Sequence, residues 1–174
     1  KDFIETSVIS DSGDGLYTEN KLQDNILALY ITAPNNNQFN GAKIEKILTD
    51  IGMIYGDMNV FHYYENSTIG DYKEEVEPEN KNSSKPFFSV ANMYEPGTFD
   101  LNLMDSFETK GIVFFMQINT HRDNDVVLSR LLDIAINFSE SINGSLNVEP
   151  GTPLDEYHIL KLRRRVAVDK DENL

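Results

Sequence analysis

The sequence predicts one α+β domain in which an antiparallel sheet of five to six strands packs against three helices on one face. Short segments in which apolar residues alternate indicate strands, and three longer segments with apolar residues every three or four positions indicate helices. The chain has 174 residues and no cysteine, so it is long enough to form a core without a disulfide. The order of these segments predicts a split β-α-β arrangement.

Five segments are predicted as strands, at 26–33, 53–64, 87–93, 111–119 and 145–148. In the first of them, Leu27 and Leu29 point to one face and Ala28 to the other. The segment 111–119 is the most apolar of the five. The connection between the second and third strands is acidic, which suits the loop of a hairpin and hence an antiparallel sheet.

The helices are predicted at 41–51, at 125–142 and after Thr152, with a further short helical segment near 101–107. Gly52 follows the first helix at the position where a helix commonly ends. Thr152 can cap the last helix, with Pro153 as its first residue. One apolar stripe along the first helix is expected to face the core, and it consists of Ile44, Ile47, Leu48 and Ile51.

Two acidic, polar segments interrupt this pattern. Residues 1–25 carry no apolar period and are interpreted as the disordered end of an acidic linker. Residues 65–85 are interpreted as a mobile acidic loop within a domain that spans 26–174. Because the chain starts at Lys1 without a methionine, we expect it to be a piece of a longer protein.

Composition excludes several classes of function. Fifteen Lys and Arg against 29 Asp and Glu give a formal net charge of −14, which disfavours nucleic acid and anionic lipid as partners. The three histidines, His62, His121 and His158, share no metal-ligand spacing. His121, followed by Arg122 and Asp123, is more simply a solvated loop residue than a general base. We therefore expect no enzyme activity, no metal and no cofactor.

The sheet is predicted to be apolar on both faces, which is unusual for an antiparallel sheet with helices on one side. In the strand at 111–119, Phe114 and Met116 share one face, while Val113 and Phe115 lie on the other. Outward residues of the other strands extend this second patch, which is predicted to be an exposed groove for a short amphipathic peptide. The predicted binding residues are Ile26, Ala28, Met58, Val60, Ala91, Met93, Val113 and Phe115.

Two alternatives to peptide binding remain open at this stage. Another part of the chain, such as the N-terminal segment or the acidic loop, could cover the apolar patch, although both are very polar. Alternatively, two copies of the chain could stack through the same sheet face, which would make the domain a homodimerising assembly module.

Four motifs resemble the C-terminal domain of the bacterial cell-division protein family ZipA. They are Gly56-Asp57-Met58-Asn59-Val60-Phe61-His62, Phe88-Ser89-Val90-Ala91-Asn92-Met93, Pro96-Gly97-Thr98-Phe99-Asp100 and Phe115-Met116-Gln117. The resemblance covers about residues 26–174 and includes Asn40-Gly41 and Thr152-Pro153. Four motifs in this order are far more specific than any one of them.

The resemblance implies a function as well as a fold. It implies that the domain is monomeric and holds the C-terminal tail peptide of FtsZ, the tubulin-like GTPase of the division ring, in a shallow hydrophobic groove. It also implies an N-terminal membrane anchor outside this chain, which would tether and stabilise the ring at the cytoplasmic face of the inner membrane. Carried over by position, the groove residues are the eight already predicted from alternation.

The sequence departs from the family pattern in two places. The acidic loop at 65–85 is longer than in the family, and Glu95 stands where a basic residue is expected beside the groove. The FtsZ tail is partly acidic, so Glu95 and the net charge of −14 argue against electrostatic steering. We expect binding to be mainly hydrophobic, with weak dependence on salt.

Overall fold

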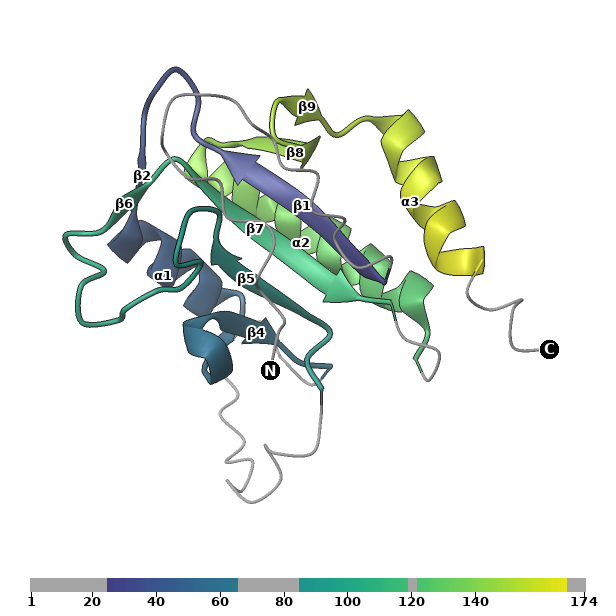
Figure 1. Cartoon of the computed structure of the whole chain (residues 1–174), viewed down its shortest axis with the longest axis horizontal. Coiled ribbons are helices and arrows are strands. Elements are labelled where there is room, and N and C mark those ends of the chain that lie inside the picture. The colour runs from purple at the N-terminus through teal and green to yellow at the C-terminus, as the bar shows by residue number, and fades with distance from the viewer. Residues whose placement is uncertain (1–24, 66–84, 119–121, 169–174) are drawn as a thin grey trace.

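The computed structural model describes residues 25–65, 85–118 and 122–168 (Figure 1). Residues 1–24 of the expected linker and 66–84 of the expected acidic loop lie outside these ranges. The longer strands are β1 (Ile26–Thr32), β5 (Phe88–Asn92), β7 (Gly111–Gln117) and β8 (Ser145–Glu149). The shorter strands are β2 (Phe39–Asn40), β3 (Ile54–Tyr55), β4 (Phe61–Tyr63), β6 (Glu108–Thr109) and β9 (Thr152–Pro153).

Within the described ranges, seven strands form one antiparallel sheet in the order β3-β4-β5-β7-β1-β8-β9. β7 and β1 lie at its centre and pair along the whole of β1, from Ile26 opposite Gln117 to Thr32 opposite Gly111. β2 and β6 form a separate two-stranded ladder. The predicted α+β class is confirmed, and the sheet has more strands than expected because β3 and β9 are only two residues long.

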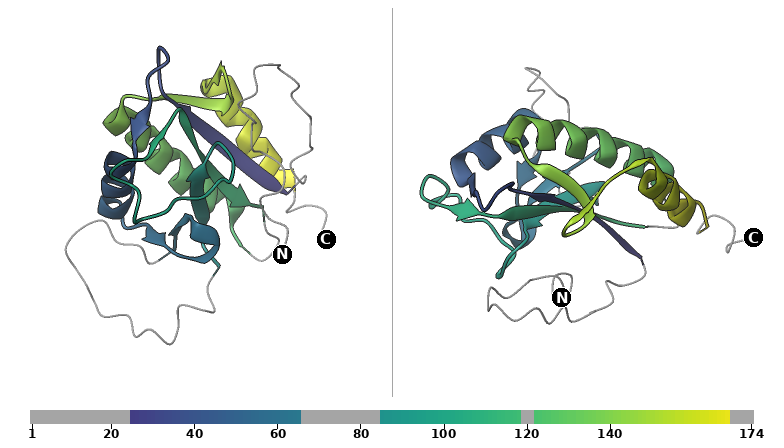
Figure 2. Two further views of the ribbon diagram at one scale, coloured as in Figure 1. Left: turned by 60° about the vertical axis from the view of Figure 1, so that its left-hand side comes forward. Right: turned by 90° about the horizontal axis from the view of Figure 1, so that it is seen from above.

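The helices are α1 (Gly41–Asp50), α2 (Asn124–Ile142) and α3 (Glu156–Val168). Figure 2 shows α1 and α2 covering one face of the sheet, with α3 beside them near β1. Asn40 caps α1 by accepting a hydrogen bond from the Lys43 amide at 3.1 Å, and the Asp123 carboxylate caps α2. Asn143 ends α2 in the left-handed conformation, which its short polar side chain tolerates.

The main core fills the space between this helical layer and the sheet. Leu27, Leu29 and Phe114 of the central strands are fully buried there, and the Phe114 ring packs edge-on against Phe138 of α2 at 5.5 Å. The predicted stripe of α1 also faces this core, with Ile44 and Leu48 completely buried. Alternation therefore assigned the core face of the central strands correctly.

Three local predictions were wrong. The segment 53–64 is two short strands separated by a turn, because Met58 and Asn59 adopt positive φ angles that a strand does not allow. Residues 101–106 form turns rather than a helix. Thr152 and Pro153 form β9 against β8 instead of starting a helix, and α3 begins only at Glu156.

Candidate binding face

Side chains that alternate with the core residues point to the opposite face of the sheet, which we call the second face. A smaller apolar cluster lies there, separate from the main core. Its register follows from the central strands, because Val113 lies opposite both Tyr30 of β1 and Ala91 of β5. The buried members of the cluster are Tyr30, Val60, Ala91, Met93 and Val113, and the half-buried residues packed on them are Ala28, Tyr94 and Phe115.

Six of the eight predicted binding residues belong to this cluster: Ala28, Val60, Ala91, Met93, Val113 and Phe115. The other two lie outside it. Ile26 begins β1 on the same face as Ala28, and Met58 occupies the turn between β3 and β4. Sequence reasoning did not include Tyr94 in the site, nor did it propose Tyr30 as a binding residue. Tyr30 lies two residues after Ala28 in β1 and so shares its face, whereas Tyr94 follows the end of β5, where alternation no longer applies.

These residues are less exposed than the sequence predicted, because the sequence indicated an open apolar groove. The side chains at the centre are buried, with Val60 only 1% and Val113 6% exposed. They pack on one another and on the two tyrosines, which the predicted groove did not take into account. Around this centre, Ile26, Ala28 and Phe115 are half-buried. The second face therefore has a closed apolar centre and more accessible apolar side chains around it.

Two large apolar side chains stand out from the surface near this cluster. Met58 is 43% exposed and Ile54 is 44% exposed. Ile54 pairs with His62, which pairs with Ser89, which in turn lies opposite Phe115. This row of cross-strand partners places Ile54 on the second face, and the sequence prediction missed it because β3 is too short to show alternation.

The backbone around Met58 is held in an uncommon conformation. Met58 has φ 63° and ψ 13°, a left-handed geometry that a residue with a long side chain rarely adopts. Several hydrogen bonds fix the turn, including Gly56 N–H to the Val60 carbonyl at 3.1 Å and Phe99 N–H to the Asn59 carbonyl at 2.9 Å. The turn therefore presents the Met58 side chain to solvent from a fixed position.

A polar pair links this turn to the sheet. The two nitrogens of His62 contact the Ser89 hydroxyl at 2.7 Å and the Asp57 carbonyl at 2.8 Å. Both His62 and Ser89 are buried on the second face beside Phe115. With both ring nitrogens occupied by structural hydrogen bonds, His62 serves to anchor the turn that carries Met58.

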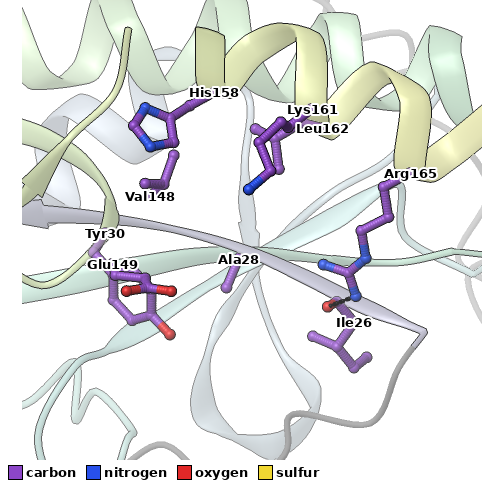
Figure 3. A pocket seen from close by; sticks show the side chains of 9 residues that line it. All are labelled: Ile26, Ala28, Tyr30, Val148, Glu149, His158, Lys161, Leu162 and Arg165. Carbon is purple, nitrogen blue, oxygen red and sulfur yellow. Dashed lines mark hydrogen bonds between the residues drawn. The ribbon is translucent and has the colours of Figure 1, made fainter.

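A pocket of about 440 Å³ adjoins the cluster where β1 meets α3. Figure 3 shows Tyr30 and Glu149 at one side of this pocket and the basic side chains of α3 at another. Burial raises the pKa of Tyr30, and the nearby Glu149 carboxylate raises it further. The pocket is lined by Ile26, Ala28, Tyr30, Val148, Glu149, His158, Lys161, Leu162 and Arg165.

Other candidate chemistry from the sequence has structural roles or lies outside the described ranges. His121 is outside them, Asp123 caps α2, and Arg122 donates to the carbonyls of Lys85 and Pro86. Arg122 also lies over the Phe87 ring at 5.0 Å. Among the described residues, no group of three or more acidic, histidine or cysteine side chains is arranged to hold a metal ion.

Within residues 25–65, 85–118 and 122–168, no helix is both long enough and apolar enough to cross a lipid bilayer.

Comparison with known proteins identifies relatives over most of the chain. Residues 25–165 match the family described as "ZipA, C-terminal FtsZ-binding domain". The chain is 33% identical over 118 residues to the cell division protein ZipA of Pasteurella multocida, which covers 68% of this chain and 32% of that protein. It is 34% identical over 122 residues to the cell division protein ZipA of Haemophilus ducreyi, a match that covers 70% of this chain and 33% of that protein. It is 30% identical over 147 residues to the cell division protein ZipA of Shewanella baltica, a match that covers 81% of this chain and 38% of that protein.

The chain thus spans about a third of the length of these curated relatives. The matched range includes β1 to β9 and most of α3, so it contains both faces of the sheet. The relatives are named as cell division proteins, and the family is named as an FtsZ-binding domain. The family match and the identities together show that this chain belongs to the ZipA C-terminal FtsZ-binding domain family.

Proposed function

We propose that the second face binds the C-terminal tail peptide of FtsZ. Of the eight predicted residues, the accessible Ile26, Ala28, Met58 and Phe115 would contact the peptide together with Ile54, and the buried Val60, Ala91, Met93 and Val113 would support them from below. The observation that carries this proposal is the apolar cluster on the face that α1 and α2 leave uncovered. Met58 and Ile54 extend this apolar surface into solvent, and Phe115 lies half-buried in the cluster. An amphipathic peptide would pack its apolar side chains against these residues.

The expected affinity is modest. Burial of about 400 Å² of apolar surface contributes roughly 10 kcal/mol before costs. Loss of overall motion and ordering of the peptide together cost several kcal/mol, which leaves a Kd in the micromolar range. The closed centre of the face suits this estimate, because packed side chains give the peptide a surface that needs little rearrangement.

Within the complete protein, we propose that this domain links FtsZ filaments to the membrane. In this arrangement an anchor elsewhere in the protein attaches to the cytoplasmic face of the inner membrane at the division site. The domain itself contributes the contact with FtsZ, and by holding many filament tails it would stabilise the ring. The name of the matching family, an FtsZ-binding domain of a cell-division protein, supports this role.

Two substitutions test the face assignment. Phe115→Ala is expected to weaken tail-peptide binding by about 1–3 kcal/mol, as for a central aromatic anchor, with little change in stability. Leu131→Ala on α2 is expected to lower the free energy of unfolding by about 2–5 kcal/mol, because Leu131 is fully buried in the main core. Fluorescence anisotropy with the labelled tail peptide measures binding, and urea denaturation measures stability.

The two readouts separate the possible outcomes. Lost binding of Phe115→Ala at unchanged stability supports the proposal. Equal destabilisation by both substitutions would mean that Phe115 acts as a core residue. Absence of saturable peptide binding by the unmodified domain would refute the proposed function itself.

A further inference from the structure

We propose that the pocket between β1 and α3 is a second binding subsite, which receives an extended acidic segment of the partner peptide. This inference rests on the proposed function, because it extends the peptide from the second face across the edge of β1. Ala28 and Tyr30 belong to the apolar cluster and also line the pocket, so the pocket adjoins the second face. Three features of the pocket support the proposal: main-chain groups of Ala28 that β8 leaves unpaired, positive charge from Lys161, and an apolar wall.

β8 leaves the main-chain groups of Ala28 unpaired because it pairs with only part of β1. The pairing covers Tyr30 to Thr32, and α3 lies beside the remaining residues of β1. Asn25 directs its carbonyl to β7, and Ile26 directs its own to Arg165 of α3 at 2.7 Å. Main-chain groups alternate in direction along a strand, so the amide and carbonyl of Ala28 also face α3. Within the described part of the chain, no strand pairs with Ala28 on that side.

Main-chain groups of a strand that no other strand pairs with are suited to an extended peptide. Its main chain could exchange hydrogen bonds with Ala28 in the same way as an added strand. Side chains of the peptide would then alternate between the apolar residues of the pocket, such as Val148 and Leu162, and the basic residues of α3.

The charges of the pocket select an acidic segment. Lys161 and Arg165 line it, and Figure 3 shows the Lys161 side chain extending from α3 toward Ala28. Lys161 packs over the Tyr157 ring at 5.5 Å, and no described carboxylate forms an ion pair with it. Among the described residues, Glu149 is the carboxylate that lines the pocket, and it lies next to Tyr30. In a protein with net charge −14, this local positive charge favours a carboxylate of the partner.

This subsite changes one expectation from the sequence. From the sequence, Glu95 and the net charge of −14 predicted that binding depends only weakly on salt. Arg165 contacts β1, and Lys161 lines the pocket beside it. A salt-dependent part of the binding energy would therefore come from α3.

The test uses the domain with the FtsZ tail peptide of its own organism, measured by fluorescence anisotropy at low and high salt. Lys161→Gln is compared with Arg164→Gln, which removes the same charge from an exposed position of α3 that does not line the pocket. Lys161→Gln is expected to weaken binding about threefold to tenfold at low salt. Arg164→Gln is expected to match the unmodified domain, and Lys161→Arg to retain most of the affinity.

Peptide variants identify the group that Lys161 recognises. A peptide with its Asp and Glu residues replaced by Asn and Gln is expected to bind Lys161→Gln and the unmodified domain equally. Hydrogen exchange is expected to show slower exchange of the Ala28 amide in the complex. If only amidation of the peptide's C-terminus removes the difference between the two domains, the subsite binds a chain end and the proposed extended segment is wrong.

The outcomes also separate this inference from the proposed function. If Lys161→Gln binds like Arg164→Gln while Phe115→Ala loses binding, the subsite is refuted and the proposed function stands. If neither Lys161→Gln nor Phe115→Ala changes binding, both are refuted.

Discussion

Met58 combines two properties that are individually uncommon: a left-handed backbone and a large apolar side chain exposed to solvent. A left-handed conformation costs a non-glycine residue about 1–2 kcal/mol. Because the Met58 side chain is exposed, its packing within the domain offsets little of this cost. The surrounding hydrogen bonds hold the turn, so the strained residue serves to position its side chain. This arrangement is understandable if the Met58 side chain gains its contacts only from a partner.

Met58→Asn separates the two properties, because asparagine tolerates the left-handed conformation well. The free energy of unfolding is expected to rise by about 0.5–1 kcal/mol, while affinity for the tail peptide falls by about 1 kcal/mol or more. Urea denaturation and anisotropy titration measure the two effects. Val126→Asn, which removes an exposed apolar side chain from α2, is the control and should leave binding unchanged. A lower free energy of unfolding for Met58→Asn would contradict the claim that the left-handed conformation of Met58 costs stability.

Among the elements, α3 shows how local sequence signals can mislead. Thr152-Pro153 has the composition of a helix start, yet these residues pair with β8, with Pro153 opposite Asn147. The Leu154 amide then donates to the Leu146 carbonyl at 3.0 Å, which continues the pairing past β9. The helix begins instead after Asp155, whose carboxylate accepts a hydrogen bond from the His158 amide at 2.9 Å. The hairpin that β8 forms with β9 decided the structure of these residues.

Asp155 also predicts how the start of α3 responds to acid. The hydrogen bond from the His158 amide lowers the pKa of Asp155 below its ordinary value. A carboxyl group whose pKa is lower in the folded state stabilises the fold above its unfolded pKa, and this contribution is lost as the pH falls through the folded pKa. The protection factors of α3 amides, which are exchange rates corrected for the intrinsic effect of pH, are therefore expected to fall below about pH 4. Asp155→Asn should remove most of this dependence at the start of α3, and an unchanged dependence would contradict the assignment.

At the scale of the whole molecule, periodicity predicted which face of the sheet a residue lies on better than it predicted where strands end and which distant residues meet. Alternation in the central strands placed Leu29 in the main core and Phe115 on the second face, because both strands are long enough to show the pattern. It failed at Met58, where a turn interrupts the strand. Sequence also did not reveal the contact between Arg165 and the Ile26 carbonyl, which joins the two ends of the domain. The exposed fraction of a side chain and the contacts between residues far apart in the sequence depend on tertiary packing, which the local pattern of apolar residues does not determine.

Because the sheet is apolar on both faces, two copies of the domain could in principle pair through the second face. A stable dimer through the second face would need to bury about 800 Å² on each copy. The most apolar part of that face is already buried within one chain, and two copies would each bring a net charge of −14. We therefore predict a monomer in sedimentation velocity at concentrations up to several hundred micromolar and at moderate salt. A concentration-dependent dimer that Met58→Lys dissociates would contradict this prediction and favour the assembly module, because it would place the dimer contact on the second face.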